Sequence, residues 1–452
     1  MTADWPQKER SCTMPEITPS HRISKGGRFP WRTLLTLGFG LSLLSACGGG
    51  GGGNGSGSTA NATSSTTTTT ITSSTSSTTT ASISISGDGN TVIEPGVTIT
   101  SVGTNSTIAF TTQGNQTLSN VFTFNSASLA ALGIPKNTAR TNSGPALSFL
   151  LHLVGTGVGD NGVTFQSVTN PQGKALDLSI QPCVPNYCGV LVPRIPAMIG
   201  VDGSWSFRLQ SAASTVGDFK LYVTLRAGQT PDTNTKIVVA PYMLKASRYS
   251  ATSIKAALDH LVAIYSKNQL TVQVRDITVV DDSRYLVTNL DFSDPTTQSL
   301  IAKGTTDAVN IFFVDDFTDF GALGIASAIP GSMGLAGGFN GILIGLAPHR
   351  INRILDTNFL GETAAHEMGH FLGLFHTSES DGVTFDPIAD TPECPIGRDI
   401  NRSGSVEADE CAGLAADNLM FWTPYTTTGT RVTQDGLTND QRTVIRYAPI
   451  GQ

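Results

Sequence analysis

The chain has 452 residues, of which 39% are hydrophobic, and its 28 Lys and Arg against 35 Asp and Glu give a net charge of -7. An acidic surface repels the phosphate backbone, so this balance argues against a nucleic-acid partner. The length exceeds that of one typical domain, so we expect at least two folded parts.

Residues 1–46 are predicted to be a lipoprotein signal peptide. Three basic residues between positions 25 and 32 precede the apolar run 34–44, which is too short to span a membrane comfortably. The run ends in Leu44-Ser45-Ala46-Cys47, which resembles a bacterial lipobox. That resemblance implies export and lipidation of Cys47, with a membrane anchor in the bacterial envelope, at the outer membrane or cell surface. A plain signal peptide followed by a coincidental cysteine is the alternative.

Residues 47–85 are almost entirely Gly, Ser and Thr. Such a segment cannot bury enough apolar surface to fold, so we predict a flexible tether. Removal of residues 1–46 takes away six Lys and Arg and three Asp and Glu, which leaves 22 minus 32, or -10. The mature protein is therefore expected to be more acidic than the whole chain.

Residues 86–245 are predicted to form an all-β sandwich domain. Segments 204–209 and 221–226 alternate apolar and polar side chains, which is typical of strands that bury one face. Turn-forming residues at 159–162 separate strands of this kind. No motif indicates what this domain does.

Residues 246–452 are predicted to form a second domain of the α+β class. Apolar residues between Ile254 and Tyr265 have helical spacing, so a helix should back a sheet. Strand-like runs follow at 270–280 and 309–314, and the second is apolar on both faces, as expected of a central strand. The run 341–346 is predicted to be the edge strand of a mixed sheet.

The segment His366-Glu367-Met368-Gly369-His370-Phe371-Leu372-Gly373-Leu374-Phe375-His376 predicts a catalytic zinc site. His366 and His370 lie one helical turn apart, and Gly373 can end the helix in a left-handed conformation that returns His376 to the same ion. Three neutral ligands and one open position are typical of catalytic rather than structural zinc. Glu367 lies beside them and is predicted to act as the general base on the attacking water.

The pattern H-E-x-x-H-x-x-G-x-x-H resembles that of the metzincin zinc endopeptidases. Met420, within 417–422, looks like the methionine turn that lies beneath the metal in this family. Segments 390–392, 418–420 and 437–442 are similar to the pappalysin branch, and the resemblance covers about 246–452. It implies a mixed sheet, a backing helix, an active-site helix, a Met turn, and a protein or peptide substrate that adds to the edge strand.

Two features of the remaining residues matter for the site. Many metzincins have a Tyr two residues after the Met, but here that position is Trp422, and Tyr425 is out of register. Oxyanion stabilisation would then rest on zinc alone.

His152 and His260 are predicted to be packing or surface residues, and His349 is a candidate for the rim of the cleft.

Residues Asp399 to Glu410 match a twelve-residue calcium loop with Gly404 at its sharp turn. A polar loop with coincidental carboxylates is the alternative. The resemblance also implies a calcium ligand at Asp390. The predicted Ca²⁺ ligands are thus Asp399, Asn401, Ser403, Ser405, Glu410 and Asp390.

Four cysteines remain after export besides Cys47. Their even number, their short separations and an oxidising compartment predict the local disulfides Cys183–Cys188 and Cys394–Cys411. The alternative makes the sandwich an inhibitory pro-segment, in which Cys183 or Cys188 would cap the zinc as a thiolate.

These observations predict a surface-anchored, zinc-dependent endopeptidase that hydrolyses peptide bonds with metal-activated water and Glu367. The alternative is an adhesin or ligand-binding lipoprotein whose metzincin-like half is only a scaffold. Glu367 argues against the alternative, since a purely structural metal site needs no base.

Overall fold

The computed structural model describes residues 146–159, 162–180, 183–198, 203–211, 216–228, 235–319, 321–427 and 430–450, together with short strand segments between 79 and 124. The predicted signal peptide and the lipidation site Cys47 lie outside the described residues. In the described part of the chain, no helix is both long enough and apolar enough to cross a membrane.

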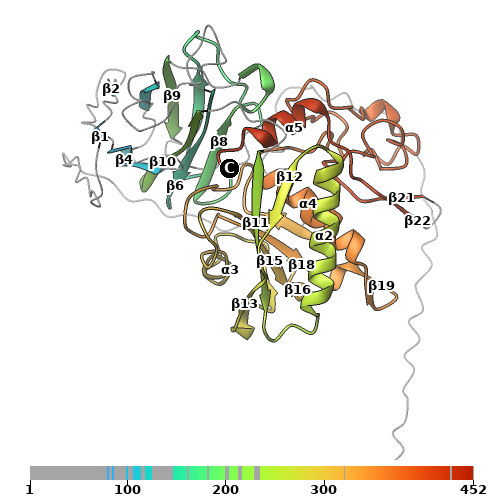
Figure 1. Cartoon of the computed structure of the whole chain (residues 1–452). Helices are drawn as coiled ribbons and strands as arrows, with labels where there is room; N and C mark the ends of the chain where they lie inside the picture. The colour runs from blue at the N-terminus through green and yellow to red at the C-terminus, as the bar shows by residue number, and fades with distance from the viewer. Residues whose placement is uncertain are drawn as a thin grey trace, which may run out of the picture. The chain divides into compact units, whose positions relative to one another are not determined.

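The first part of the chain contains two four-stranded antiparallel sheets (Figure 1). One has the order β4 (Asn105–Gln113), β10 (Val216–Gly228), β6 (Ala146–Val154), β8 (Tyr187–Val192). The other has the order β2 (Ser84–Ile85), β5 (Leu118–Phe124), β9 (Gly203–Ser211), β7 (Val163–Thr169). Phe149 of β6 and Trp205 of β9 meet edge to face at 5.0 Å between ring centroids, so side chains of the two sheets are in contact.

Two short strands fall inside the predicted tether, 47–85. β1 (Thr79–Thr80) pairs with β3 (Thr98–Ile99), and β2 pairs with β5. The arrangement of this part as a sandwich remains a prediction.

The second part is built on a six-stranded sheet of order β12 (Thr271–Val274), β11 (Lys236–Leu244), β15 (Val309–Val314), β18 (Ile342–Gly345), β17 (Gly324–Ala326), with β13 (Thr278–Val280) also paired to β11. All neighbours are parallel except β17, which is antiparallel to β18. β15 is buried along its whole length, as predicted for a central strand.

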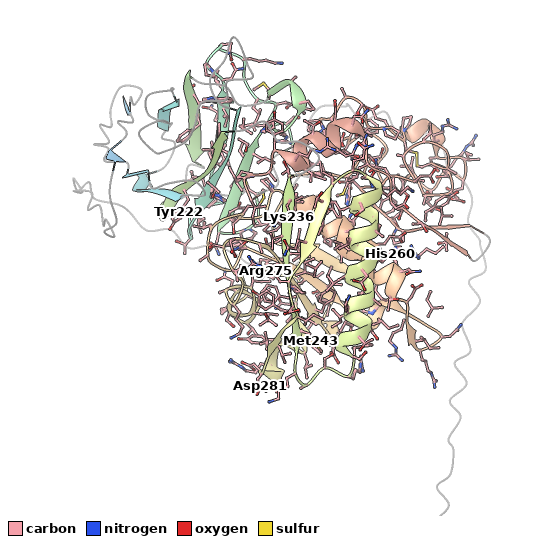
Figure 2. All side chains as sticks on the ribbon, viewed as in Figure 1. Tyr222, Lys236, Met243, His260, Arg275 and Asp281 are labelled. Atoms are coloured by element: carbon pink, nitrogen blue, oxygen red, sulfur yellow. A yellow bond between two sulfur atoms is a disulfide. The ribbon has the colours of Figure 1, made fainter. Side chains whose placement is uncertain are left out.

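Three sequence-based expectations about this sheet were wrong in detail. β11 lies before the predicted boundary at 245/246, yet it is a central strand of the second sheet; Figure 2 labels Lys236 and Met243 near its two ends. The run 270–280 forms two strands, β12 and β13, rather than one. The predicted edge strand 341–346 contains β18, which is paired on both sides, and the edge is β17.

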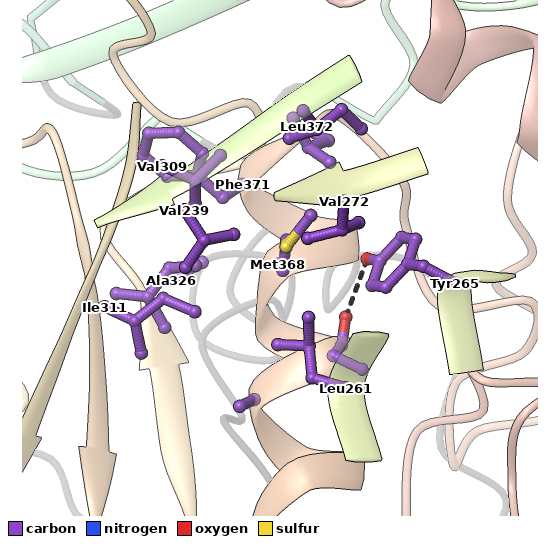
Figure 3. Packing of buried hydrophobic residues seen from close by; sticks show 14 of the residues in the cluster. Val239, Leu261, Tyr265, Val272, Val309, Ile311, Ala326, Met368, Phe371 and Leu372 are labelled. Atoms are coloured by element: carbon purple, nitrogen blue, oxygen red, sulfur yellow. Dashed lines mark hydrogen bonds between the residues drawn. The ribbon is translucent and has the colours of Figure 1, made fainter. Parts of the chain in front are cut away.

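Both faces of the sheet are covered. α2 (Ala251–Lys267) and α4 (Thr357–Phe371) pack on one face, and α3 (Pro295–Ile301) packs on the other. Each face of the sheet has its own buried hydrophobic cluster, and adjacent residues of a strand point to opposite faces. The first cluster, with α2 and α4, contains Val239, Ile311 and Ile344, and the second, with α3, contains Val238, Phe312 and Leu343. Figure 3 shows Met368 and Phe371 of α4 in the first cluster, and the 3.0 Å hydrogen bond from the Tyr265 hydroxyl of α2 to the Ala365 carbonyl.

Short elements complete the second part. α5 (Asn439–Arg446) begins with a capping box in which Thr438 and Gln441 bond each other's backbone amides. The remaining strand pairs are β14 (Val287–Thr288) with β16 (Asp316–Phe317), β19 (Arg350–Ile351) with β20 (Ile354–Leu355), and β21 (Tyr425–Thr427) with β22 (Thr430–Val432). Single 3₁₀ turns are η1 (Pro196–Met198), η2 (Ser283–Tyr285), η3 (Ala347–His349) and η4 (Ile396–Arg398).

Both predicted disulfides are present. Cys183 bonds Cys188, and Cys394 bonds Cys411 across the base of the 399–410 loop. Because Cys183 and Cys188 are bonded to each other, neither is available as a thiolate to cap a metal. The zinc-capping alternative is therefore contradicted.

His152 and Tyr187 lie where the first part contacts the second. His152 is fully buried and lies 3.1 Å from the Tyr187 hydroxyl, which donates to the Pro330 carbonyl at 3.3 Å. Leu191 of β8 belongs to the same buried cluster as Phe371 of α4. His152 is thus a packing residue, as predicted, and the C-terminal end of α4 packs against β8.

Candidate metal centre and active site

The helix α4 carries most of the predicted site. The Asp356 carboxylate caps its N-terminus by accepting the backbone N–H groups of Asn358 and Phe359, each at 3.0 Å. The helix ends next to Gly373, whose φ of +103° is strained for residues with a Cβ atom. The chain can therefore reverse there and return His376 toward the helix.

The three predicted zinc ligands converge. The Nε2 atom of His376 lies 3.0 Å from that of His370 and 3.3 Å from that of His366. Ligands at ~2.0–2.1 Å from zinc at the corners of a tetrahedron are about 3.3 Å apart. This is the one group of three or more potential ligand residues found among the described residues.

A carbonyl or carboxylate fixes the orientation of each imidazole. The Nδ1 atoms of His366, His370 and His376 lie 2.6 Å from the Leu419 carbonyl, 2.8 Å from the Leu374 carbonyl and 2.9 Å from the Glu379 carboxylate. These oxygens can only accept, so each Nδ1 carries the proton and each Nε2 presents a lone pair.

The electrostatics of the cluster suit a cation. Burial, with His376 as the second cause, lowers the pKa of His366 to about 3 and that of His370 well below its usual range. His366 and His370 are therefore neutral, as metal ligands must be. Three lone pairs that face one another with no proton between them fit a zinc ion.

The predicted Met turn lies directly beneath the helix. Met420 is fully buried, and a Cβ atom added at Gly369 would lie 2.4 Å from its sulfur, so the glycine permits this close approach. The Asn418 side chain accepts the Met420 N–H at 2.8 Å and pairs with the Gln441 amide of α5. The turn thereby also places the Leu419 carbonyl within hydrogen-bond distance of the His366 Nδ1 atom.

Glu367 lies on the side of α4 that faces the sheet edge. Its side chain is buried, and its Oε2 accepts the Ala326 N–H of β17 at 2.9 Å. Burial raises the pKa of Glu367 to about 8, and the Ala326 hydrogen bond opposes that shift. The sequence did not indicate this contact, because it depends on which strand is the edge.

Sequence reasoning also missed Glu379. A metal-ligating histidine needs an acceptor for its second nitrogen, and an acidic residue three positions after His376 was the available signal.

We expect Glu379→Gln to weaken zinc binding by about 10–100-fold, because the amide is a weaker acceptor for Nδ1–H than the carboxylate. Turnover should return at saturating zinc, since Glu379 contacts no reacting atom. Activity measured against buffered free zinc would check this. An unchanged zinc dependence would show that the contact does not tune the metal.

His349 is not at the cleft rim, contrary to the prediction. It is fully buried: its Nδ1 donates to the Gly345 carbonyl at 2.6 Å and its Nε2 accepts from the Thr363 hydroxyl at 2.8 Å. It therefore ties α4 to the end of β18. Burial lowers its pKa to about 4, and the Gly345 hydrogen bond opposes the shift.

The buried, neutral His349 is expected to make the folded protein less stable at acid pH. Its folded pKa is below the unfolded value of about 6.5, so the unfolded chain binds more protons between these values and stability falls as pH falls through this window. The slope should reach about 1.4 kcal/mol per pH unit for this one group. Thermal melts from pH 7 to 4 should show a shallower loss for His349→Gln. Equal slopes would assign the acid lability to other groups.

The predicted calcium loop closes on itself through its own carboxylates. Asp399 accepts the backbone N–H groups of Ser403 and Gly404, and Glu410 accepts those of Ile400 and Asn401. The φ of +89° at Gly404 matches the sharp turn expected there.

Asp390 has a structural contact of its own. Its Oδ2 accepts the Asp440 N–H in the first turn of α5 at 3.1 Å. Calcium binding at Asp390 and at the loop remains a prediction.

The residues after the Met turn supply no phenol in the family position. Trp422 packs against Phe421 with ring centroids 6.2 Å apart. Tyr425 belongs to the same buried cluster as Phe421, together with Val406 and the Cys394–Cys411 disulfide, and Trp422 packs against this cluster.

Comparisons with known proteins agree with this chemistry. The chain is similar to extracellular metalloproteases. It is 34% identical over 119 residues to extracellular metalloprotease 1 of Coccidioides posadasii, 37% over 113 to an extracellular metalloprotease of Colletotrichum graminicola, and 35% over 159 to one of Podospora anserina. These matches cover 24%, 22% and 29% of this chain and 41%, 38% and 52% of the relatives. The chain thus spans about two fifths to half of their length.

No protein-family model matches the chain. Among solved structures, metalloproteinase-II from Bacteroides fragilis gives a TM-score of 0.27 at 15% identity, covering 47% of this chain and 53% of that one. Archaemetzincin from Methanopyrus kandleri gives 0.24 at 12%, covering 48% and 89%. Likenesses at these scores carry no conclusion, so the assignment rests on the residues and on the curated relatives.

Proposed function

We propose that the protein is a zinc-dependent endopeptidase of the metzincin type, with the pappalysin branch as its nearest pattern. The observation that carries the proposal is the convergence of the His366, His370 and His376 Nε2 atoms on one point, with the Glu367 carboxyl on the same helix. The similarity to extracellular metalloproteases supports the same chemistry.

The zinc site and Glu367 are proposed to have different roles in hydrolysis. Zinc, when bound, supplies the charge that polarises the scissile carbonyl and lowers the pKa of a water in the open position. Glu367 takes the proton of the attacking water and passes it to the leaving amine. The Ala326 N–H donates to one carboxylate oxygen of Glu367, so the other oxygen remains for the water.

The substrate is proposed to lie extended along β17. This strand is the edge of the sheet, and a peptide can add to such an edge as a further strand. The hydrogen bond from the Ala326 N–H to Glu367 supports this placement, because it holds the general base against β17. A bound peptide would therefore pass directly over the general base.

Export and surface anchoring through Cys47 complete the proposal. Export is supported by the basic residues and apolar run, and by the extracellular location in the names of the curated relatives. The anchoring part of the proposal rests on the lipobox-like sequence alone. The test of the function itself is digestion of a diverse peptide library by the purified protein, with product mapping by mass spectrometry. Sequence-selective internal cleavage is expected. A protein that binds zinc but cleaves no peptide or denatured protein would contradict the proposal.

Calcium binding gives a separate prediction. Carboxylates in the 399–410 loop repel one another until a cation neutralises them, so millimolar calcium should raise the melting temperature. A ligand at a hundredfold excess over Kd adds about 2.7 kcal/mol. The double variant Asp399→Ala, Glu410→Ala should lose most of the rise. If it responds as the parent does, the loop is only a polar connection.

A further inference from the structure

Residues 327–341 join the edge strand β17 to its neighbour β18, and we call them the β17–β18 connection. At its ends, the Ser327 N–H donates to the Gly341 carbonyl at 3.1 Å. In its middle, the Gly331 N–H donates at 3.0 Å to the carbonyl of Phe371, the last residue of α4. A Cβ atom added at Gly331 would overlap the Phe371 ring, so a glycine is needed for this close approach.

Two carbonyls of the connection accept hydrogen bonds from the first part of the chain. The Tyr187 hydroxyl of β8 donates to the Pro330 carbonyl at 3.3 Å, and the Thr224 hydroxyl of β10 donates to the Met333 carbonyl at 2.9 Å. All four residues are buried. Removal of either hydroxyl would therefore take a donor from a carbonyl that water reaches poorly, which is costly.

His152 of β6 links the two hydroxyls. Its Nε2 lies 2.9 Å from the Thr224 hydroxyl, and its Nδ1 lies 3.1 Å from the Tyr187 hydroxyl. Burial lowers the pKa of His152 to about 3, so the ring is neutral and carries one N–H. The shorter distance assigns that N–H to Nε2, and Tyr187 then shares its one proton between the ring and Pro330. Thr224 is therefore the stronger donor to the connection.

The strand β17 depends on the connection for its position. It is three residues long, and it pairs with β18 on one side, while its other side is the edge of the sheet. The Ala326 N–H of this strand donates to Glu367, and the connection begins at the next residue. A displaced connection would therefore move the proposed substrate strand and the hydrogen bond to the general base together.

We propose that Tyr187, Thr224 and His152 position the strand β17 for substrate binding, so that the first part of the chain is a working component of the protease. The inference rests on the proposed function. The three are positioning residues, because they act through the β17–β18 connection. A displacement of about 1 Å in an element that positions the substrate can lower the rate about 10²-fold, so modest contacts at this distance from the zinc site can matter.

The test compares two quenched fluorescent peptides with one mapped cleavage site, using the full-length protein with zinc. The long peptide can pair along the whole of β17, and the short peptide spans only the residues next to the cleaved bond. The ratio of their kcat/KM values does not depend on the fraction of enzyme that is folded. We expect the parent to prefer the long peptide about tenfold, as one or two further main-chain hydrogen bonds would give.

Removal of both hydroxyls should abolish most of this preference. The double variant Tyr187→Phe, Thr224→Val keeps the size of both side chains and deletes only the two donors. Of the single variants, Thr224→Val should lower the ratio more than Tyr187→Phe. Thr224→Ser retains a hydroxyl and should retain the parent's ratio, which a role in packing alone would not predict.

A matched control removes hydroxyls that are equally buried. Tyr285→Phe with Thr297→Val deletes one tyrosine and one threonine hydroxyl of the second part, and both of these bond residues outside the connection. The control should keep the parent's length preference, even if its melting temperature falls.

Hydrogen exchange reports on β17 directly. In the double variant, peptides that contain Ala326 should exchange faster than in the parent, while β15 keeps its protection, because the loosening is local. If the double variant fails to fold, Thr224→Val and Thr224→Ser decide the question.

Folded variants that keep the parent's length preference, or its exchange at Ala326, would overturn this inference and leave the proposed function intact. A double variant more active than the parent would also overturn it, because the first part would then restrain the protease. A parent that cleaves both peptides equally well would remove β17 as the substrate strand, and the inference with it. A parent that cleaves no peptide would overturn the proposed function itself.

Discussion

Glu367→Gln is expected to reduce kcat/KM by about 10²–10⁴-fold, the range that positioned acid–base groups contribute. The amide has nearly the same shape as the carboxyl, but it cannot accept the proton of the attacking water. Glu367 ligates no metal in the proposed site, so zinc content should be unchanged. Peptide hydrolysis and metal analysis on the same preparation would check both parts.

Asp259→Asn provides the matched control, because it makes the same carboxyl-to-amide change on the exposed side of α2. It should leave turnover at the parent's level. A Glu367→Gln protein with undiminished turnover would contradict the mechanism and favour an adhesin or ligand-binding role, in which the metal site is a scaffold that needs no base.

Removal of the metal should have the second large effect. A chelator is expected to abolish proteolysis, and zinc should restore it, because the reaction depends on the charge that the three histidines hold. Stability should fall as well. Zinc at a thousandfold excess over Kd adds about 4 kcal/mol to the free energy of unfolding, and its loss leaves three lone pairs facing one another in a buried site.

Activity and thermal melting during a zinc titration would measure both consequences. Calcium added to the chelated protein is the control, and it should not restore hydrolysis even if it raises the melting temperature. His376→Ala should reproduce the loss of activity and resist rescue by zinc. Full activity in the presence of excess chelator, with zinc absent by metal analysis, would exclude a metal-dependent reaction.

Spacing along the chain determined the local parts of the site. The three histidines lie at helical and turn spacing, so their convergence follows from the rise of a helix and the freedom of Gly373. Both disulfides were predictable for the same reason, since each pair is close in sequence. The helix α2 and the buried strand β15 also follow from periodicity, which reports how many faces an element buries.

Tertiary structure alone decided which strand is the edge and what contacts the site. β17 and β18 are both short and buried, so their sequences do not show which of them is paired on two sides. Strand order depends on pairing between distant segments, and the contact between Ala326 and Glu367 depends on that order. His349 is buried between Gly345 and Thr363, whereas its position after a strand indicated an exposed residue. Periodicity predicts a residue's face within its own element, but only the packing of elements against each other determines which group it meets.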